Sequence, residues 1–277
     1  MFDEERLIRL ALEEDVGSGD VTTEAVVPSH AEGTAEFVAK ETLVPAGIAV
    51  AQRVFTTLDE GLSFGSFHAD GDWLEKGTVI FQATGNLRAL LTGERTALNF
   101  LQRLSGIASY TRRFADAVSN TSVRITDTRK TAPGWRKLEK YAVSVGGGHN
   151  HRFGLYDGIL IKDNHIRACG GISKAVDLAR QKKGHLLAIE VEVSDFKELE
   201  EALAAGVDMI MLDNMNPSEI EKSVTIVDGR VPLEVSGGVS LDAISRLAET
   251  GVDIISIGAL THSARAVDIS MNIVTES

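Results

Sequence analysis

The second half of the chain repeats one hydrophobic pattern. Short apolar runs alternate with amphipathic segments such as 195–205 and 241–250, which are predicted to be helices. The apolar runs cover 123–126, 158–161, 187–191, 209–212, 231–235 and 254–257, and the last four begin roughly 20 to 23 residues apart. Continuous apolar strands that alternate with helices are typical of parallel βα units buried on both faces. Because no dinucleotide-binding glycine motif is present, six such units favour an α/β barrel over an open nucleotide-binding sheet.

The first half, up to about Leu104, has helix and strand patterns in an irregular order. Helices are predicted over 4–14, 48–58 and 86–118, and strands over 34–40 and 78–83. This order is typical of an α+β domain. We therefore predict an N-terminal domain at 1–104 and a barrel domain at 105–263, with the tail 264–277 packed against the first domain.

Two predicted helices lead into strands through similar residues, Ala205-Gly-Val-Asp208 and Thr250-Gly-Val-Asp253. In both, the glycine can supply the cap at the carboxyl end of the helix. The sequence therefore predicts that Gly206 and Gly251 end helices.

Composition and charge exclude several classes of protein. The chain has 277 residues, of which 43% are hydrophobic and 25% charged, as in ordinary globular proteins. Its net charge of −12 argues against binding to nucleic acid or anionic membranes. A single cysteine, Cys169, cannot form an internal disulfide, and the acidic N-terminus does not resemble a signal peptide. A cytoplasmic protein is predicted.

Polar or glycine residues follow each of the six predicted strands. In α/β barrels, the loops at the carboxyl ends of the strands build the active site. A single charged residue at a strand end is usually a solvated loop residue, but six consecutive examples predict a shared site. The segments are Asp127–Lys130, Lys162–His165, Glu192, Asp213–Asn214, Ser236–Gly238 and Gly258–Ala259.

The local charge indicates the kind of ligand. Between Arg124 and Lys162 there are eight Lys and Arg residues against three acids, so this segment carries +5 in an acidic chain. Clustered cations of this kind suit a small, strongly anionic ligand. Glycines at Ser236–Gly238 and Gly258 leave backbone N–H groups open to a phosphate. Three of the cations, Arg136, Lys137 and Lys140, are interpreted instead as decorating a helix face after Pro133.

Two acids at strand ends, Glu192 and Asp213, leave two interpretations open. Carboxylates on neighbouring strands suit Mg²⁺, which prefers oxygen ligands and is often bound together with substrate phosphates. They could equally act as a general acid and base. The nearby histidines, His149, His151 and His165, lack partners at a zinc-binding spacing, so contact with an anionic substrate is preferred.

These segments resemble a known family. The stretch DTRKTAPGWRKLEKYAVSVGGGHNHRFGLYDGILIKDNH resembles the signature of the quinolinate phosphoribosyltransferases, and similar motifs extend from ALEEDVGSGDVTT to TGVDIISIGALTHS. The resemblance implies an α/β N-terminal domain packed on an incomplete, TIM-like α/β barrel. It also implies dimers or hexamers, Mg²⁺ as cofactor, and transfer of phosphoribosyl from phosphoribosyl pyrophosphate to quinolinate with loss of CO2.

The resemblance further implies roles for individual residues. Quinolinate would contact Arg129, His151, Arg152 and Lys162, with Arg95 reaching in from a neighbouring subunit, and Thr128 would also bind substrate. Lys130, Glu192 and Asp213 match the catalytic positions around phosphoribosyl pyrophosphate and Mg²⁺. The phosphate-binding loops would be Ser236, Gly237 and Gly238 together with Ile257, Gly258 and Ala259. Without the resemblance, Arg95 would be interpreted as a solvated helix residue.

Three competing hypotheses remain at this point. Lys162 at a strand end could be the Schiff-base lysine of an aldolase-type barrel. A transferase specific for nicotinate would need to bind only one carboxylate. A paralogous group associated with molybdate transport is disfavoured, because the Asn150-His-Arg152 and Lys162-Asp-Asn-His165 segments that it loses are intact here.

Overall fold

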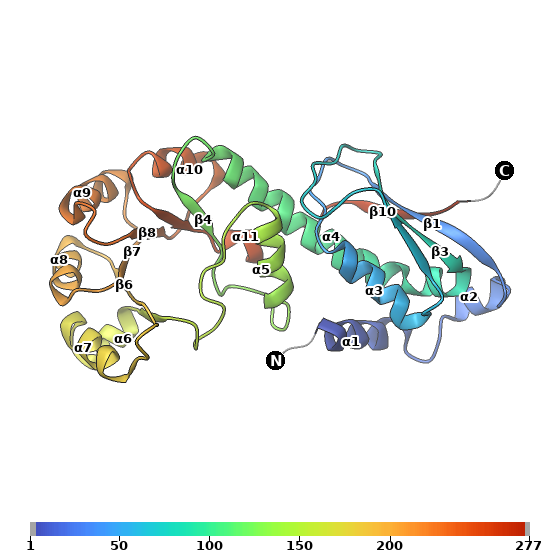
Figure 1. The fold of residues 1–277 in the computed structure, drawn as a ribbon, viewed down its shortest axis with the longest axis horizontal. Coiled ribbons are helices and arrows are strands. Elements are labelled where there is room, and N and C mark those ends of the chain that lie inside the picture. Colours follow the sequence, from blue (N-terminus) through green and yellow to red (C-terminus); the bar gives the residue numbers. More distant parts are fainter. Residues whose placement is uncertain (1–3, 275–277) are drawn as a thin grey trace. The chain divides into compact units, whose positions relative to one another are not determined.

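A computed structural model of the protein describes residues 4–274, and its contacts divide the chain into two compact units. The first unit contains the residues up to Arg112, Ala132–Gly147 and the segment from Ser263 onward. The second contains Arg113–Thr131 and Gly148–His262. Each unit is therefore built from segments that are separate in the sequence (Figure 1).

The first unit contains a four-stranded antiparallel sheet in the order β10-β1-β3-β2. Its strands are β1 (Glu32–Ala39), β2 (Ser63–Ser66), β3 (Val79–Asn86) and β10 (Ile269–Val274). Alternate residues of β1 are buried, and Phe37 stacks on Phe81 of β3 with the ring centres 4.1 Å apart. Phe55 packs edge-on against Phe37 and completes this aromatic core. The strand patterns predicted at 34–40 and 78–83 are confirmed as β1 and β3.

Five helices belong wholly or largely to the first unit, and the three that the pattern predicted are confirmed. They are α1 (Glu4–Val16), α2 (Val21–Val26), α3 (Ile48–Leu58), α4 (Leu87–Ala117) and α5 (Arg136–Val145). The interpretation of Lys140 as a surface residue of α5 is wrong, since this side chain is 1% exposed. Lys140 is one of five buried residues of α5, together with Leu138, Glu139, Ala142 and Val143. None of the described helices combines the length and apolarity needed to cross a membrane.

A buried ion pair holds α5 within this unit. Glu139 is fully buried, and its carboxylate accepts hydrogen bonds from Arg103 Nη2 (2.9 Å) and from the backbone N–H of Ala132 (3.2 Å). Removing one partner of a buried ion pair typically costs about 3–5 kcal/mol. We therefore expect Glu139→Ala to lower the free energy of unfolding by about this amount in urea denaturation. Glu14→Ala, an exposed change on α1, should alter it by less than about 0.5 kcal/mol; equal losses would contradict the prediction.

The second unit contains a six-stranded parallel sheet in the order β4-β9-β8-β7-β6-β5. The strands are β4 (Arg124–Thr126), β5 (Ile159–Ile161), β6 (Ile189–Val193), β7 (Met209–Asp213), β8 (Leu233–Ser236) and β9 (Ile254–Ser256). Within the described part of the chain, β4 and β5 form the two edges and do not pair with each other. The prediction of an incomplete α/β barrel beside an N-terminal α+β domain is confirmed.

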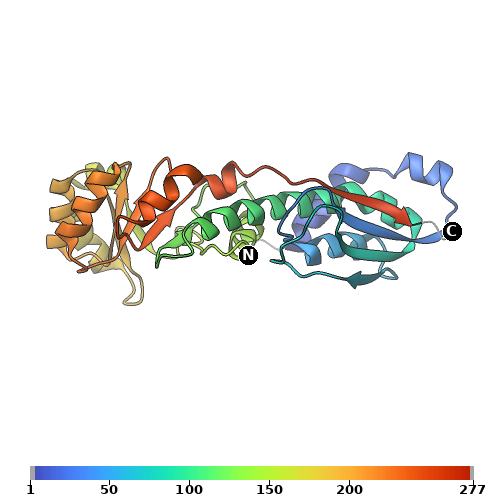
Figure 2. The same ribbon diagram turned by 90° about the horizontal axis from the view of Figure 1, so that it is seen from above.

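Helices cover the outer side of this sheet. They are α6 (Asp163–Cys169), α7 (Ile172–Lys182), α8 (Phe196–Ala205), α9 (Pro217–Val227), α10 (Leu241–Ala248) and α11 (Ala259–His262). In Figure 1, α7 to α10 form an arc around the strands, and Figure 2 shows the yellow and orange helices stacked beside the sheet. Because the strands are parallel, their carboxyl ends point in one direction, as a shared site requires.

One of the two predicted helix caps is correct. Gly206 has φ of +68° and caps α8, where an L-residue with a side chain would be strained. The prediction for Gly251 is wrong, because α10 ends at Ala248 and is capped by Glu249. The Gly-Val-Asp sequence at 206–208 and at 251–253 therefore occurs in two different turns.

Candidate active site

A cavity of about 470 Å³ lies at the carboxyl ends of the second unit's strands. We call it the carboxyl-end cavity. It brings together eleven of the fifteen residues predicted to bind substrates, from six separate chain segments. These are Thr128, Arg129, Lys130, His151, Arg152, Lys162, Glu192, Asp213, Ser236, Gly237 and Gly238. Leu160, Met211, Asn214, Glu234 and Ser256 complete the lining.

The predicted loop Ile257–Ala259 does not line the cavity, but it contacts Lys130, which does. Ile257 is buried, and its N–H donates to the carbonyl of Thr126 (2.9 Å). A Cβ added to Gly258 would lie 2.8 Å from Cδ of Lys130, so the glycine allows the lysine side chain to pass close to this loop. Thr261 Oγ1 also donates to the carbonyl of Lys130 (2.8 Å). In this structure the loop therefore positions Lys130.

Arg95 lies on α4 in the first unit and is exposed. It borders a different hollow, which is also lined by Asp15, Asp20 and Thr92. Nothing in the single chain distinguishes it from a solvated helix residue. Its predicted contribution to a neighbouring subunit's site stays a prediction.

Two of the four lysine and arginine side chains that line the cavity are guanidinium groups close to each other. The pKa of Arg152 is lowered, first by burial and then by the nearby positive charge of Arg129. Arg152 Nη1 donates to the carbonyl of Gly158 (2.9 Å), which holds the side chain in place. A carboxylate or phosphate bound between the two guanidiniums would relieve their repulsion, so the arrangement favours an anion.

An ion pair joins Lys162, which precedes α6, to Glu192 of β6. A salt-bridged ammonium is not a nucleophile, which argues against the Schiff-base hypothesis. Asp213, at the end of the neighbouring strand β7, accepts a hydrogen bond from Asn214 Nδ2 (2.8 Å). Glu192 and Asp213 thus present carboxylate oxygens on adjacent strands of one cavity, a donor set that fits Mg²⁺ held together with ligand oxygens.

The turn after β8 approaches the turn after β7 very closely. Gly237 has φ of +100°, and a Cβ there would lie only 2.3 Å from Oδ1 of Asn214. The N–H of Asn214 donates to the carbonyl of Ser236 (3.0 Å), so the two turns interlock. Gly238 has nothing within 4 Å of its Cβ position and opens the backbone to the cavity. Backbone N–H groups exposed before a helix, here α10, are suited to bind phosphate.

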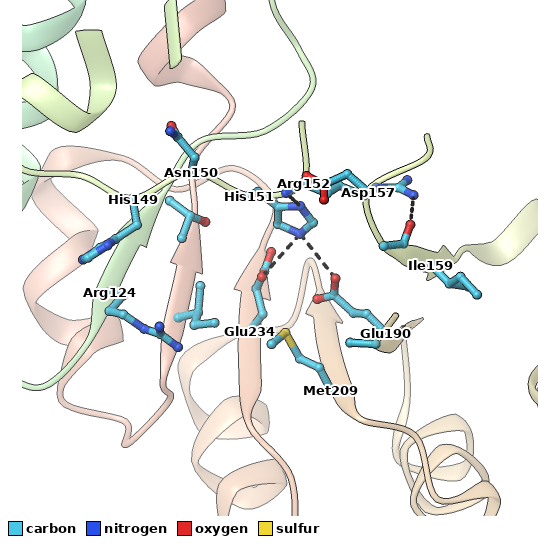
Figure 3. Close-up of a pocket in the computed structure, with 14 residues that line it drawn as sticks. Arg124, His149, Asn150, His151, Arg152, Asp157, Ile159, Glu190, Met209 and Glu234 are labelled. Atoms are coloured by element: carbon cyan, nitrogen blue, oxygen red, sulfur yellow. Dashed lines mark hydrogen bonds and ion pairs between the residues drawn. The ribbon is translucent and has the colours of Figure 1, made fainter. Parts of the chain in front are cut away.

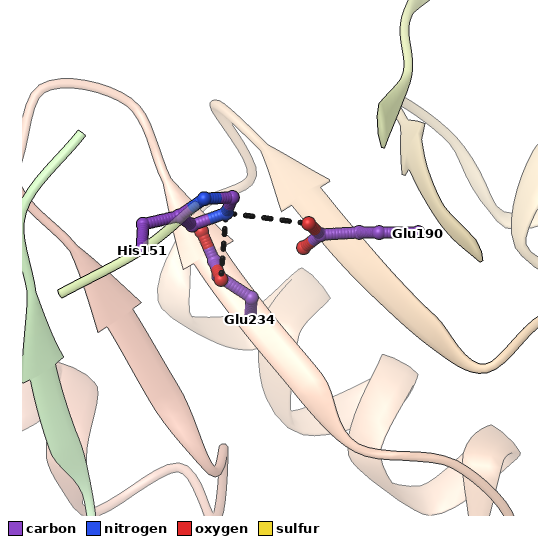
Figure 4. Close-up of side chains that lie close together, drawn as sticks. All are labelled: His151, Glu190 and Glu234. Carbon is purple, nitrogen blue, oxygen red and sulfur yellow. Dashed lines mark ion pairs between the residues drawn. The ribbon is translucent and has the colours of Figure 1, made fainter. Parts of the chain in front are cut away.

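A buried cluster below the cavity contains two acids that the motif analysis did not select. His151 Nε2 lies 3.3 Å from Oε2 of Glu190 and 3.6 Å from Oε2 of Glu234 (Figure 4). Glu190 belongs to β6 and Glu234 to β8, and both are more than nine-tenths buried. Burial and the charge of Glu190 raise the pKa of Glu234 to about 7. The signal in the sequence was a glutamate inside each of two apolar strands.

A second cavity of about 270 Å³ lies on the other side of this cluster (Figure 3). We call it the amino-end cavity, since Arg124, Ile159, Met209 and Ile254 at the starts of strands line it. It shares only His151, Arg152 and Glu234 with the carboxyl-end cavity. The cluster therefore forms the partition between two hollows of one unit.

Comparison with known proteins gives a consistent result over the whole chain. Residues 20–105 match the family model described as quinolinate phosphoribosyl transferase, N-terminal domain, and residues 107–272 match the C-terminal domain model. A curated relative from Bacillus subtilis, named "Probable nicotinate-nucleotide pyrophosphorylase [carboxylating]", is 47% identical over 94% of this chain and 90% of its own length. A chloroplastic relative from Arabidopsis thaliana with the same enzyme name is 42% identical over 99% and 84%.

Solved structures agree with this comparison. NadC from Streptococcus pyogenes is 45% identical, with a TM-score of 0.93 over 98% of this chain and 96% of that one. The nicotinate-nucleotide pyrophosphorylase from Francisella tularensis is 41% identical, with a TM-score of 0.94 over 98% and 95%. The similarity therefore extends through both units.

Proposed function

The chain belongs to the quinolinate phosphoribosyltransferase family, and we propose that it transfers phosphoribosyl from phosphoribosyl pyrophosphate to quinolinate. The products are nicotinate mononucleotide, pyrophosphate and CO2, and the reaction serves NAD biosynthesis. The observation that carries the proposal is the carboxyl-end cavity, where cationic side chains meet a bare glycine turn in a chain of net charge −12. Quinolinate carries two carboxylates, and its cosubstrate carries a phosphate and a pyrophosphate, so both ligands match this cavity.

Quinolinate would bind on the side of the cavity that holds Arg129 and Arg152. Their guanidiniums can each bind a carboxylate through two parallel hydrogen bonds, which fixes the plane of the ring. Thr128, His151 and Lys162 border the same space and would complete the binding of the second carboxylate. This orientation aims the ring nitrogen at the cosubstrate.

The cosubstrate would lie towards Lys130 and the turn Ser236–Gly238. The N–H groups of the turn would bind the 5′-phosphate, and the ammonium of Lys130 would stabilise the negative charge of the leaving pyrophosphate. We propose Mg²⁺ as cofactor, held by Glu192 and Asp213 directly or through water and ligand hydroxyls, where it would neutralise pyrophosphate charge.

Both steps of the reaction depend on the stabilisation of charge that develops on the substrates. As pyrophosphate leaves, C1 of the ribose gains oxocarbenium character and the pyridine nitrogen attacks it. The cations hold the two reactants close together and stabilise the leaving charge. The alkylated ring nitrogen is positive, so it can stabilise the electron pair that remains on C2 when the adjacent carboxylate departs as CO2.

We also propose a cytoplasmic homo-oligomer, a dimer or hexamer, in which Arg95 of one subunit completes the quinolinate site of another. The exposure of Arg95 in the single chain supports this, because the residue is available for such a contact. Arg95→Ala tested in the assembled enzyme would then raise the KM for quinolinate without dissociating the oligomer.

Turnover of two pyridine acids tests the proposal. The purified protein is incubated with phosphoribosyl pyrophosphate, Mg²⁺ and either quinolinate or nicotinate, and CO2, pyrophosphate and the mononucleotide are measured together. We expect equal amounts of the three products from quinolinate and at least about 100-fold slower turnover of nicotinate, which lacks the second carboxylate. Comparable rates would instead favour a nicotinate transferase, and absence of turnover with both would overturn the proposal.

A further inference from the structure

The partition between the two cavities contains one acid that borders both. Glu234 lines the carboxyl-end cavity and the amino-end cavity, whereas Glu190 lines only the second. One carboxylate oxygen of each, Oε1, is buried and has no hydrogen-bond partner within the described residues. Buried polar atoms are normally paired with protein or water, so these oxygens indicate a place for water or another donor.

The hydrogen bond at His151 Nδ1 favours a proton over a metal ion at this cluster. The backbone N–H of Arg152 donates to His151 Nδ1 at 2.7 Å, so Nδ1 has no proton of its own (Figure 3). In the neutral ring the proton is then on Nε2, which faces Glu190 and Glu234. A protonated Nε2 cannot be a metal ligand. The cluster is therefore suited to hold a proton between His151 and the two carboxylates.

The surroundings of Glu234 favour its protonated form near neutral pH. It is 1% exposed, and Glu190 approaches it from β6 with a negative charge. His151 and Ser256 face it as hydrogen-bonding groups, and Arg152 borders the same two cavities. Desolvation and a neighbouring carboxylate both oppose ionisation, so they raise its pKa to about 7 despite the opposing effect of His151.

The reaction under "Proposed function", on which this inference rests, requires a proton at this point. When the carboxylate on C2 leaves as CO2, the C–C bond breaks and its electron pair stays on C2. Nicotinate mononucleotide carries hydrogen at that carbon, so one proton must arrive. Water admitted beside the substrates during the earlier transfer step would compete with the pyridine nitrogen for the ribose carbon, and a proton source on the other side of the partition avoids this.

We propose that the carboxyl group of Glu234 donates this proton to C2, and that water in the amino-end cavity restores it. In the step, the O–H bond of Glu234 breaks, the C2–H bond forms, and Glu234 becomes a carboxylate. A proton from bulk solvent, relayed through water in the amino-end cavity, then restores the carboxyl group of Glu234. Glu190 acts as a positioning residue whose negative charge keeps the proton on Glu234, and His151 orients the two carboxylates.

Single-turnover kinetics of Glu234→Gln test the donor. Glutamine has the same shape but cannot give up a proton, so the electron pair on C2 would recapture CO2. We expect pyrophosphate release within about twofold of wild type, while CO2 release slows at least about 100-fold and the N-ribosylated dicarboxylate accumulates. Glu221→Gln, an exposed change on α9 that lines neither cavity, should leave both steps unchanged.

Two further measurements do not depend on the folding of this variant. In the wild-type enzyme the rate of CO2 release should fall tenfold per pH unit above about pH 7, because the donor is then ionised, while pyrophosphate release should not. Ala188→Phe places a bulky ring at the amino-end cavity from an exposed position. It should slow repeated turnovers more than the first one, because restoration of the proton follows the first donation.

The outcomes are distinguishable. If Glu234→Gln slows the release of pyrophosphate and of CO2 by the same factor, or slows neither step, the assignment of Glu234 is overturned. If Ala188→Phe slows repeated turnovers no more than the first one, while Glu234→Gln slows CO2 release, the route through the amino-end cavity is overturned. Failure of the wild-type enzyme to consume quinolinate would instead overturn the proposed function itself.

Discussion

Replacement of Arg152 by alanine is expected to raise the KM for quinolinate by about 10²- to 10⁴-fold and the KM for phosphoribosyl pyrophosphate by less than about threefold. Arg152 is held towards the cavity wall by its bond to Gly158, next to Arg129. Each hydrogen bond between charged groups contributes about 1.5–3 kcal/mol, and loss of two of them gives an effect of this size. Steady-state kinetics with each substrate varied in turn measure the two constants.

Two controls separate shape from charge in this experiment. Arg152→Lys keeps the charge but loses the planar pair of donors, so an intermediate loss is expected. Arg167→Ala removes an exposed guanidinium that pairs with Asp163 on α6 and lines neither cavity, so it should have no effect. Equal increases in both KM values for Arg152→Ala would contradict its assignment to quinolinate.

Gly237→Ala should reduce kcat/KM for phosphoribosyl pyrophosphate by at least about 10²-fold. The new Cβ would lie 2.3 Å from Oδ1 and 3.0 Å from N of Asn214, so the turn after β7 must move. Asn214 donates a hydrogen bond to Asp213, and displacement of one therefore displaces the carboxylate of the other. The measurement is the dependence of rate on cosubstrate at saturating quinolinate.

Gly229→Ala is the matched control for backbone strain. Gly229 also has a positive φ, +66°, but nothing lies within 4 Å of its Cβ position and it lines neither cavity. Both variants should lose about 1–2 kcal/mol of stability from the left-handed conformation, yet only the change at Gly237 should impair catalysis. Normal kinetics of Gly237→Ala would show that the turn tolerates displacement and would refute the argument.

The strands of the parallel sheet could be predicted because each of them is encoded by a short, continuous segment of the sequence. Each strand is a short apolar run between helices, and the predicted runs match β4 to β9 to within two residues at their ends. Residues directly after such strands are placed on one edge of the sheet by topology alone. For this reason Lys130, Glu192 and Asp213 could be assigned to one site from the sequence, before any contact was known.

The remaining features depend on distant contacts that no local pattern encodes. The acids Glu190 and Glu234 lie inside apolar strands, where a sequence pattern does not show that their side chains meet across the barrel. Lys140 follows Glu139 in a polar-looking helix, yet tertiary packing buries both. The pairing of Lys162 with Glu192 likewise joins segments that the resemblance had assigned to different ligands.

The pairing of β10 with β1 has a consequence for how the molecule is made. Residues 269–274 form the strand that lies along β1 (Glu32–Ala39), on the side opposite β3. On the ribosome, β1 emerges early but gains this neighbour only after the intervening barrel has been translated. Until then its hydrogen-bonding edge is open, which is the condition under which nascent chains associate with one another. Chaperone protection should therefore matter most for the segment synthesised first.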